Sequence, residues 1–151
     1  LHAWIVTMPL GKDEHIALMG NKALPRRKRS LCSHYDGAWY MEPGNPATSD
    51  YIVSIVKEIV EKYDVDGIHL DFVRWSENLK ATERTSAAIK RFKSESKVNT
   101  QTALHAWRAK KIDTFVKGAG TSIKKIRPSA IYSVAVFASY PSRYSTSYIR
   151  S

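Results

Sequence analysis

An alternation of short apolar runs with amphipathic helical patterns constrains the fold of this 151-residue chain more than any other feature. The apolar runs are rich in β-branched and aromatic residues, and they predict strands over residues 1–8, 67–73 and 131–137. Apolar residues spaced for one helical face predict a helix that follows residues 46–50 and a second helix over about residues 104–126. Because a helix follows each of the first two strands, we expect an α/β fold in which right-handed crossovers join parallel strands.

Two long segments, residues 9–44 and 76–102, follow the carboxyl ends of the first two predicted strands. We expect both to be loops, and long loops in compact domains are often functional. Ligands of parallel α/β proteins bind at the carboxyl edge of the sheet, so we expect the site beside these segments. Thr48, Ser49 or Asp50 is expected to cap the first helix.

The most informative segment covers the second predicted strand and its exit, with the sequence YDVDGIHLDFVRW. Side chains alternate along a strand, so we expect His69, Asp71 and Val73 on one face and the apolar residues between them on the other. Asp71 would then place a carboxylate at the carboxyl end of the inner face, where acid, base or nucleophilic catalysis needs one. Arg74 could keep Asp71 ionised, and Trp75 could stack on a sugar.

Simpler structural interpretations of these and neighbouring residues stay open. Asp71 could merely cap a loop, and His69 could be a hydrogen-bonded core residue with no catalytic role. Trp4 shares a face of the first strand with His2, but aromatic residues in strands are more often core than ligand platforms.

A second cluster, WYMEPGNP at residues 39–46, places a carboxylate between aromatic residues and a rigid turn. Glu42 could reach the mouth of the site while Trp39 or Tyr40 stacks on the substrate. The alternative is a helix-entry turn that carries a surface carboxylate.

The chain has a formal net charge of +10, from 24 Lys and Arg against 14 Asp and Glu, and its densest basic run is Arg26 to Arg29. This excess suits nucleic acid, an anionic envelope polymer or a membrane surface, although a solvated lysine-rich surface explains it as well. The single cysteine, Cys32, cannot form an internal disulfide and is expected to be a buried or partly buried thiol. No P-loop, GxGxxG, HExxH or zinc-type spacing is present, so no metal or cofactor is expected.

Four segments carry a family resemblance: LHAWIVTMPLG, GAWYMEPGNPATSDYIVSIVKEIVEKYDVDGIHLDFVRW, HAWRAKKIDTFV and IYSVAVFASY. Together they resemble the glycosyl-hydrolase-like family ten proteins, which are bacterial (β/α)-barrel glycosidases, some linked to cleavage of peptidoglycan glycan strands. The resemblance implies that the three strands are strands three to five of a (β/α)₈ TIM barrel. A whole barrel needs about 250 residues, so residues 1–151 are expected to be a fragment of one catalytic domain.

The resemblance also implies site residues. Asp71 matches the aspartate that ends the family's fourth strand, His69 matches the family histidine, and Glu42 matches the aspartate of its DPGNP turn. His2 and Trp4 match the His and Trp of its third strand. Phe72 and Trp75 depart from the family pattern, which usually has Tyr at both positions.

We therefore expect a glycoside hydrolase that cleaves a bacterial polysaccharide outside the cytoplasm, in the periplasm or as an outer-membrane lipoprotein. Asp71 and Glu42 would supply the two carboxyl groups of the reaction, although the partner of Asp71 could instead belong to barrel strands outside residues 1–151. The residues expected to bind substrate are His69, Arg74, Trp75, Trp4, His2, Trp39 and Tyr40.

Two other functions compete with this prediction. A non-catalytic glycan-binding module on the same scaffold would use the tryptophans as stacking platforms and would not need Asp71. A basic nucleic-acid-binding domain of flavodoxin-like topology would depend on Arg26 to Arg29 and would lose affinity steeply with salt. Nucleic acid is not the partner we expect.

Overall fold

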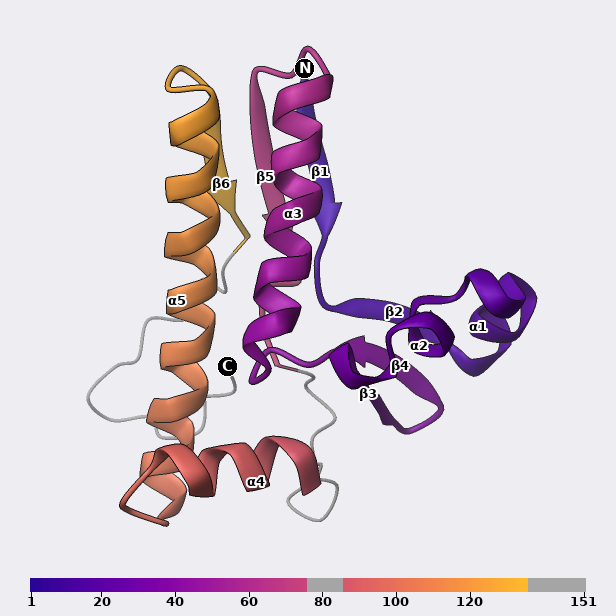
Figure 1. Cartoon of the computed structure of the whole chain (residues 1–151), viewed down its shortest axis with the longest axis vertical. Helices are drawn as coiled ribbons and strands as arrows, with labels where there is room; N and C mark the ends of the chain where they lie inside the picture. The colour runs from indigo at the N-terminus through magenta and orange to yellow at the C-terminus, as the bar shows by residue number, and fades with distance from the viewer. Residues whose placement is uncertain (76–85, 136–151) are drawn as a thin grey trace.

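The computed structural model describes residues 1–75 and 86–135, and its centre is a parallel three-stranded sheet covered on one face by two helices (Figure 1). The strands are ordered β1-β5-β6, and both neighbouring pairs are parallel, as predicted. These elements are β1 (His2–Val6), β5 (Gly67–Asp71), β6 (Ile131–Val134), α3 (Pro46–Lys62) and α5 (Gln101–Ile126).

The two faces of the parallel sheet differ in burial. Ile68 and Leu70 of β5 are 0% exposed and belong to the core that α3 and α5 complete. On the opposite face, Trp4 is 70% exposed and Val6 is 51% exposed. Residues paired across β1 and β5 share a face, so this second face is where the predicted site residues lie.

Helix α3 begins earlier than the predicted capping residues. Asn45 is its N-cap, and the Asn45 side-chain oxygen accepts a hydrogen bond from the Ala47 amide at 3.2 Å. Pro46 occupies the first helical position, where its missing N–H costs nothing. The predicted caps at residues 48–50 are therefore wrong, because the Asn-Pro pair already starts the helix.

Residues 9–44, predicted to be a loop, form a small folded unit at the carboxyl end of β1 (Figure 1). Asp36 and Gly37 have φ values of 48° and 66°, which suit the two-residue turn of a tight hairpin. An Asp-Gly pair flanked by apolar residues is a known hairpin signal, so the sequence did contain this information. The unit comprises β2 (Pro9–Lys12), α1 (Asp13–Met19), η1 (Gly20–Lys22), α2 (Leu24–Arg27), η2 (Arg29–Leu31), β3 (Cys32–Tyr35) and β4 (Ala38–Met41).

The antiparallel sheet of this unit has the order β2-β4-β3. Cys32, the first residue of β3, is buried as expected. Burial raises the pKa of the Cys32 thiol to about 11, which keeps it protonated near neutral pH.

The segment 76–102 was also predicted to be a loop, but part of it is the helix α4 (Ser86–Glu95). Helix α5 starts at Gln101, three residues before the predicted start, and Thr100 caps it by accepting a hydrogen bond from the Ala103 amide at 3.2 Å. Within the described ranges, no helix combines the length and apolarity that crossing a bilayer requires. Helices α4 and α5 enclose a second apolar cluster, made of Trp75, Ala88, Phe92, Leu104 and Trp107.

Candidate active site

Asp71 ends β5 and lies next to an exposed tryptophan. In the β1–β5 register Trp4 is opposite His69 and Val6 is opposite Asp71, so these four side chains lie together on one face of the sheet. The Trp4 indole N–H donates a hydrogen bond to Asp71 Oδ2 at 3.1 Å, while the Trp4 side chain stays 70% exposed. The structure thus joins a partly exposed carboxylate to an open aromatic ring.

The backbone at Asp71 is held in place from two sides. The Thr7 amide and the Thr7 hydroxyl both donate to the Asp71 carbonyl oxygen, at 3.0 and 2.9 Å. Asp71 Oδ1 accepts the Phe72 amide hydrogen at 2.7 Å, and Phe72 adopts a φ of 53°. Asp71 therefore does cap the turn after the strand, as the simpler interpretation held, and its other oxygen still faces Trp4.

The strand alternation predicted for residues 67–73 breaks at this turn. Phe72 is 38% exposed and Val73 is 9% exposed, the reverse of the predicted arrangement. The positive φ at Phe72 redirects the chain after Asp71, so Val73 joins the main core instead of the open face. The strand accordingly ends at Asp71.

His69 lies on the open face and has a polar partner on the third strand. Its Nδ1 is 2.9 Å from the Ser133 hydroxyl oxygen, and its ring meets the Trp4 ring edge-on at a centroid distance of 6.1 Å. His2 lies at the amino end of the same face, opposite Gly67, and is exposed. Of these two histidines, His69 is therefore the one beside the Asp71–Trp4 pair.

Arg74 and Trp75 do not take the places expected for them. The Arg74 guanidinium lies 4.4 Å from the centre of the Phe72 ring, and Asp71 forms no ion pair with any described residue. Trp75 is 4% exposed, so it lacks the open ring that stacking on a sugar requires. It is buried because α4 and α5 pack around it, and its indole N–H donates to the Arg108 carbonyl oxygen at 3.2 Å.

Glu42 is buried, not exposed at a mouth or on a surface. Its side chain is 3% exposed, and Oε2 accepts a 2.6 Å hydrogen bond from the Ser33 hydroxyl. Its Oε1 accepts the Gly44 amide hydrogen at 3.1 Å. The turn therefore folds back over its own carboxylate, while the bond from the Met41 amide to the Met8 carbonyl oxygen ties it to the chain leaving β1. A catalytic role for Glu42 stays a prediction.

Trp39 and Tyr40 lie on β4, in the antiparallel sheet. The Trp39 ring is 4.6 Å from the Arg29 guanidinium and 4.6 Å from the His34 ring, and its N–H donates to Asp13 at 2.6 Å. Tyr40 packs against Tyr35 at a centroid distance of 5.9 Å. Both rings are half-buried within the small folded unit, so their predicted substrate contacts are not supported by an open surface.

Sequence reasoning missed three residues that shape the site. Thr7 fixes the Asp71 carbonyl, and Ser133 pairs with His69 from the same register position of β6. Strand alternation could have found Ser133, because it aligns with the inner face of the third predicted strand. Strand alternation could not have identified Gly44, because the side chains that leave no room for a Cβ there are the Trp75 and Trp107 rings, which are distant in the sequence.

Most of this chain matches one known protein family. A model of the Glycosyl hydrolase-like 10 family matches residues 22–150, which include both the Glu42 turn and the Asp71 strand. This chain belongs to the Glycosyl hydrolase-like 10 family. The family resemblance seen in the sequence motifs is therefore confirmed.

Two known proteins resemble this chain over part of their length. Glycosyl hydrolase YngK of Bacillus subtilis (strain 168) is 25% identical over 115 residues, which cover 75% of this chain and 22% of that protein. The structure of alpha-L-fucosidase isoenzyme 2 from Paenibacillus thiaminolyticus is similar with a TM-score of 0.51 and 22% identity, over 68% of this chain and 15% of that one. This second likeness shows a shared α/β fold, and the chain spans less than a quarter of either protein.

Proposed function

We propose that this chain carries the catalytic carboxylate of a glycoside hydrolase, with Asp71 as that carboxylate and Trp4 as a sugar platform. The observation that carries the proposal is the hydrogen bond from the Trp4 indole to Asp71, made while the Trp4 side chain stays 70% exposed. An exposed aromatic ring can stack on the apolar face of a pyranose. The adjacent carboxylate would then lie beside the bound sugar.

The chemistry requires two carboxyl groups with different tasks. One protonates the leaving oxygen, and the other attacks the anomeric carbon or activates a water for that attack. We assign Asp71 to one of these tasks, because its Oδ2 is on the open face of the sheet. Glu42 is the proposed second group, and it would act only if the Ser33 and Gly44 hydrogen bonds to it are exchanged for contacts with substrate.

We further propose that the three-stranded sheet is part of a (β/α)₈ barrel whose interior face carries Trp4, His69 and Asp71. The parallel order, the two outer helices and the likeness to a glycosidase over part of that chain support this arrangement. A bacterial envelope polysaccharide, such as peptidoglycan glycan strands, and a location outside the cytoplasm complete the proposal, and both rest on the family resemblance.

The test is Asp71→Asn in the full-length protein, measured as the rate of reducing-end release from a panel of polysaccharides. We expect a loss of about 100-fold or more, because positioned acid, base or nucleophilic carboxylates contribute at least that much. Asp64→Asn is the matched control, since Asp64 is an exposed aspartate before the amino end of β5. A loss of less than about tenfold for Asp71→Asn, with the fold intact, would remove Asp71 from the mechanism.

A second candidate function is glycan binding without hydrolysis, and the exposed ring of Trp4 is the observation that favours it. It predicts that Trp4→Ala abolishes binding of the glycan, that Asp71→Asn weakens binding only slightly, and that the unmodified protein releases no reducing ends. Detectable hydrolysis that depends on Asp71 would exclude this alternative.

A further inference from the structure

A cleft outside the Asp71 site has a clear excess of positive charge. It has a volume of about 510 Å³ and lies between the segment of α2 and η2 and the first two turns of α3. We call it the basic cleft. Its lining residues are Arg27, Lys28, Arg29, Ser30, Leu31, Ala47, Asp50 and Tyr51.

Hydrogen bonds fix the walls of the basic cleft. The Asn45 side-chain amide donates to the Ser30 carbonyl oxygen at 2.8 Å, and the Thr48 hydroxyl donates to the Leu31 carbonyl oxygen at 3.2 Å. Arg29 is anchored as well, because its Nη1 donates to the Cys32 carbonyl oxygen at 2.8 Å. The basic residues are therefore carried on a backbone that is bonded to the start of α3, not on a loose loop.

The charge of the cleft is not balanced within it. Arg27, Lys28 and Arg29 are exposed and face one carboxylate, Asp50. The Lys28 ammonium group lies 5.5 Å from the centre of the Tyr51 ring, so a cation–π contact holds this exposed charge at the cleft. The N-terminal end of α3, which forms one wall, adds partial positive charge of its own.

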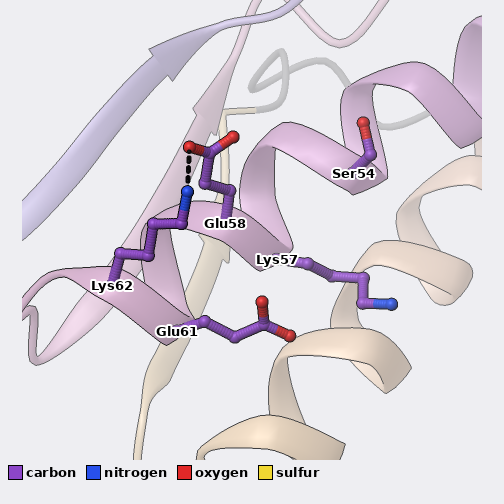
Figure 2. Close-up of a pocket in the computed structure, with 5 residues that line it drawn as sticks. All are labelled: Ser54, Lys57, Glu58, Glu61 and Lys62. Atoms are coloured by element: carbon purple, nitrogen blue, oxygen red, sulfur yellow. Dashed lines mark hydrogen bonds and ion pairs between the residues drawn. The ribbon is translucent and has the colours of Figure 1, made fainter.

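A second surface hollow of this chain gives the contrast. The groove in Figure 2 has a volume of about 310 Å³ and is lined by Ser54 and by two lysines and two glutamates of α3. Lys62 and Glu58 form an ion pair there at 2.9 Å. The charges that line the groove of Figure 2 balance, although the protein as a whole is basic. The excess positive charge of the basic cleft therefore does not simply follow from the net charge of the protein.

The position of the basic cleft relates it to the proposed active site. Figure 1 shows that β1 and β5 run toward the same end of the sheet at which α2 and the start of α3 lie, and Asp71 is the last residue of β5. A polymer bound at Asp71 could therefore continue along the same end of the molecule, toward the basic cleft.

We propose that the basic cleft binds the anionic groups of an acidic polysaccharide, and so selects charged over neutral glycan chains. This inference rests on the proposed function, and it adds the substrate class. Guanidinium and ammonium groups pair with either carboxylates or phosphodiesters, so both kinds of acidic glycan belong to the proposal. Nucleic acid is less favoured, because the family is glycosyl-hydrolase-like and the aromatic platform at Trp4 adjoins a carboxylate.

The test compares two double variants of the full-length protein by isothermal titration with four probes. The cleft variant is Arg27→Ala with Lys28→Ala, which spares the anchored Arg29. The control is Lys57→Ala with Lys62→Ala, which removes the same charge from the groove of Figure 2. The probes are polygalacturonate, a phosphomannan, neutral dextran and single-stranded DNA.

We expect the cleft variant to bind at least one acidic glycan about tenfold more weakly, and the control to change its affinity by less than about twofold. Binding to the acidic glycan should weaken with added salt. A loss of affinity for polygalacturonate indicates carboxylate recognition, and a loss for the phosphomannan indicates phosphodiester recognition. Equal losses of affinity in both variants would overturn the inference, because they would show that the net charge of the protein acts and not the cleft. No loss of affinity in either variant would overturn it as well, because the cleft would then not bind the glycan. DNA binding that is tighter than glycan binding and equally sensitive to the cleft variant would replace it with the nucleic-acid hypothesis.

The result also separates this inference from the proposed function. If Asp71-dependent hydrolysis is found but acidic glycans have no advantage, the basic cleft proposal fails alone. If no glycan is bound or cleaved in any arm, the proposed function fails as well.

Discussion

At the scale of single residues, Gly44 joins the turn that carries Glu42 to the second apolar cluster. A Cβ at this position would lie 2.7 Å from the Trp107 ring, 3.0 Å from the Trp75 ring and 3.1 Å from Glu42 Oε1. The Gly44 amide also donates to Glu42. The glycine therefore allows the turn to lie against two indole rings while it orients the buried carboxylate.

Gly44→Ala should destabilise the protein by about 1–3 kcal/mol, because the added methyl group forces ring and backbone shifts in a packed region. We expect a lower midpoint of thermal unfolding, followed by tryptophan fluorescence. Gly118→Ala in α5 is the control: a Cβ there meets nothing within 4 Å, so this helical change should stabilise by about 0.5–1 kcal/mol. Equal midpoints for the Gly44→Ala variant and the unmodified protein would show that the turn is not packed as described.

At the scale of elements, one carboxylate adds a polar contact to the apolar cluster between α4 and α5. Glu95, at the end of α4, accepts hydrogen bonds from the Trp107 N–H at 2.8 Å and from Lys111 at 2.7 Å. Burial acts to raise the pKa of Glu95, but the hydrogen bonds from Lys111 and Trp107 outweigh it and leave this pKa below its ordinary value. The ionised form is thus favoured by folding.

The pKa of Glu95 is lower in the folded protein than in the unfolded chain. Its contribution to folding stability is therefore complete above the ordinary carboxylate pKa, and it is lost as the pH falls through the pKa of the folded state. Glu95→Gln should therefore lower the unfolding midpoint at pH 7 by a few degrees at most, and much less at acid pH. Thermal melts of both proteins across this range measure the difference. A difference in unfolding midpoint that stays constant with pH would show that the charge of Glu95 does not contribute to stability.

At the scale of the whole molecule, the parallel sheet has one closed face and one open face. Trp4, Val6 and Ile131 are 70%, 51% and 54% exposed, and β1 and β6 are the edge strands of the described sheet. Exposed apolar side chains beside unpaired edges favour association between chains. In the proposed barrel this face would be the interior.

We predict that the isolated 151-residue chain is only marginally stable and self-associates, which sedimentation and thermal unfolding would measure. Val6→Lys should reduce the association, because a lysine on an edge strand discourages pairing. Since Val6 is already half-exposed, the core should not suffer. A sharp, cooperative transition of a monomeric chain would contradict this prediction.

The sequence alone determined the features that depend on local periodicity. Alternation placed His69 and Asp71 on one face, with Ile68 and Leu70 on the other, and helical spacing located α3 and most of α5. These patterns are readable because a strand or helix repeats its environment every two residues or every turn. The family motifs, confirmed over residues 22–150, belong to the same local information.

Only the tertiary structure decided which of the candidate side chains are open. The sequence predicted both Trp75 and Trp4 to bind substrate. Trp75 is covered by residues of α4 and α5, whereas Trp4 remains exposed beside Asp71. Glu42 is likewise buried by its own turn, which packs against a ring from α5. Exposure depends on which distant residues arrive to cover a side chain, and no local pattern records that.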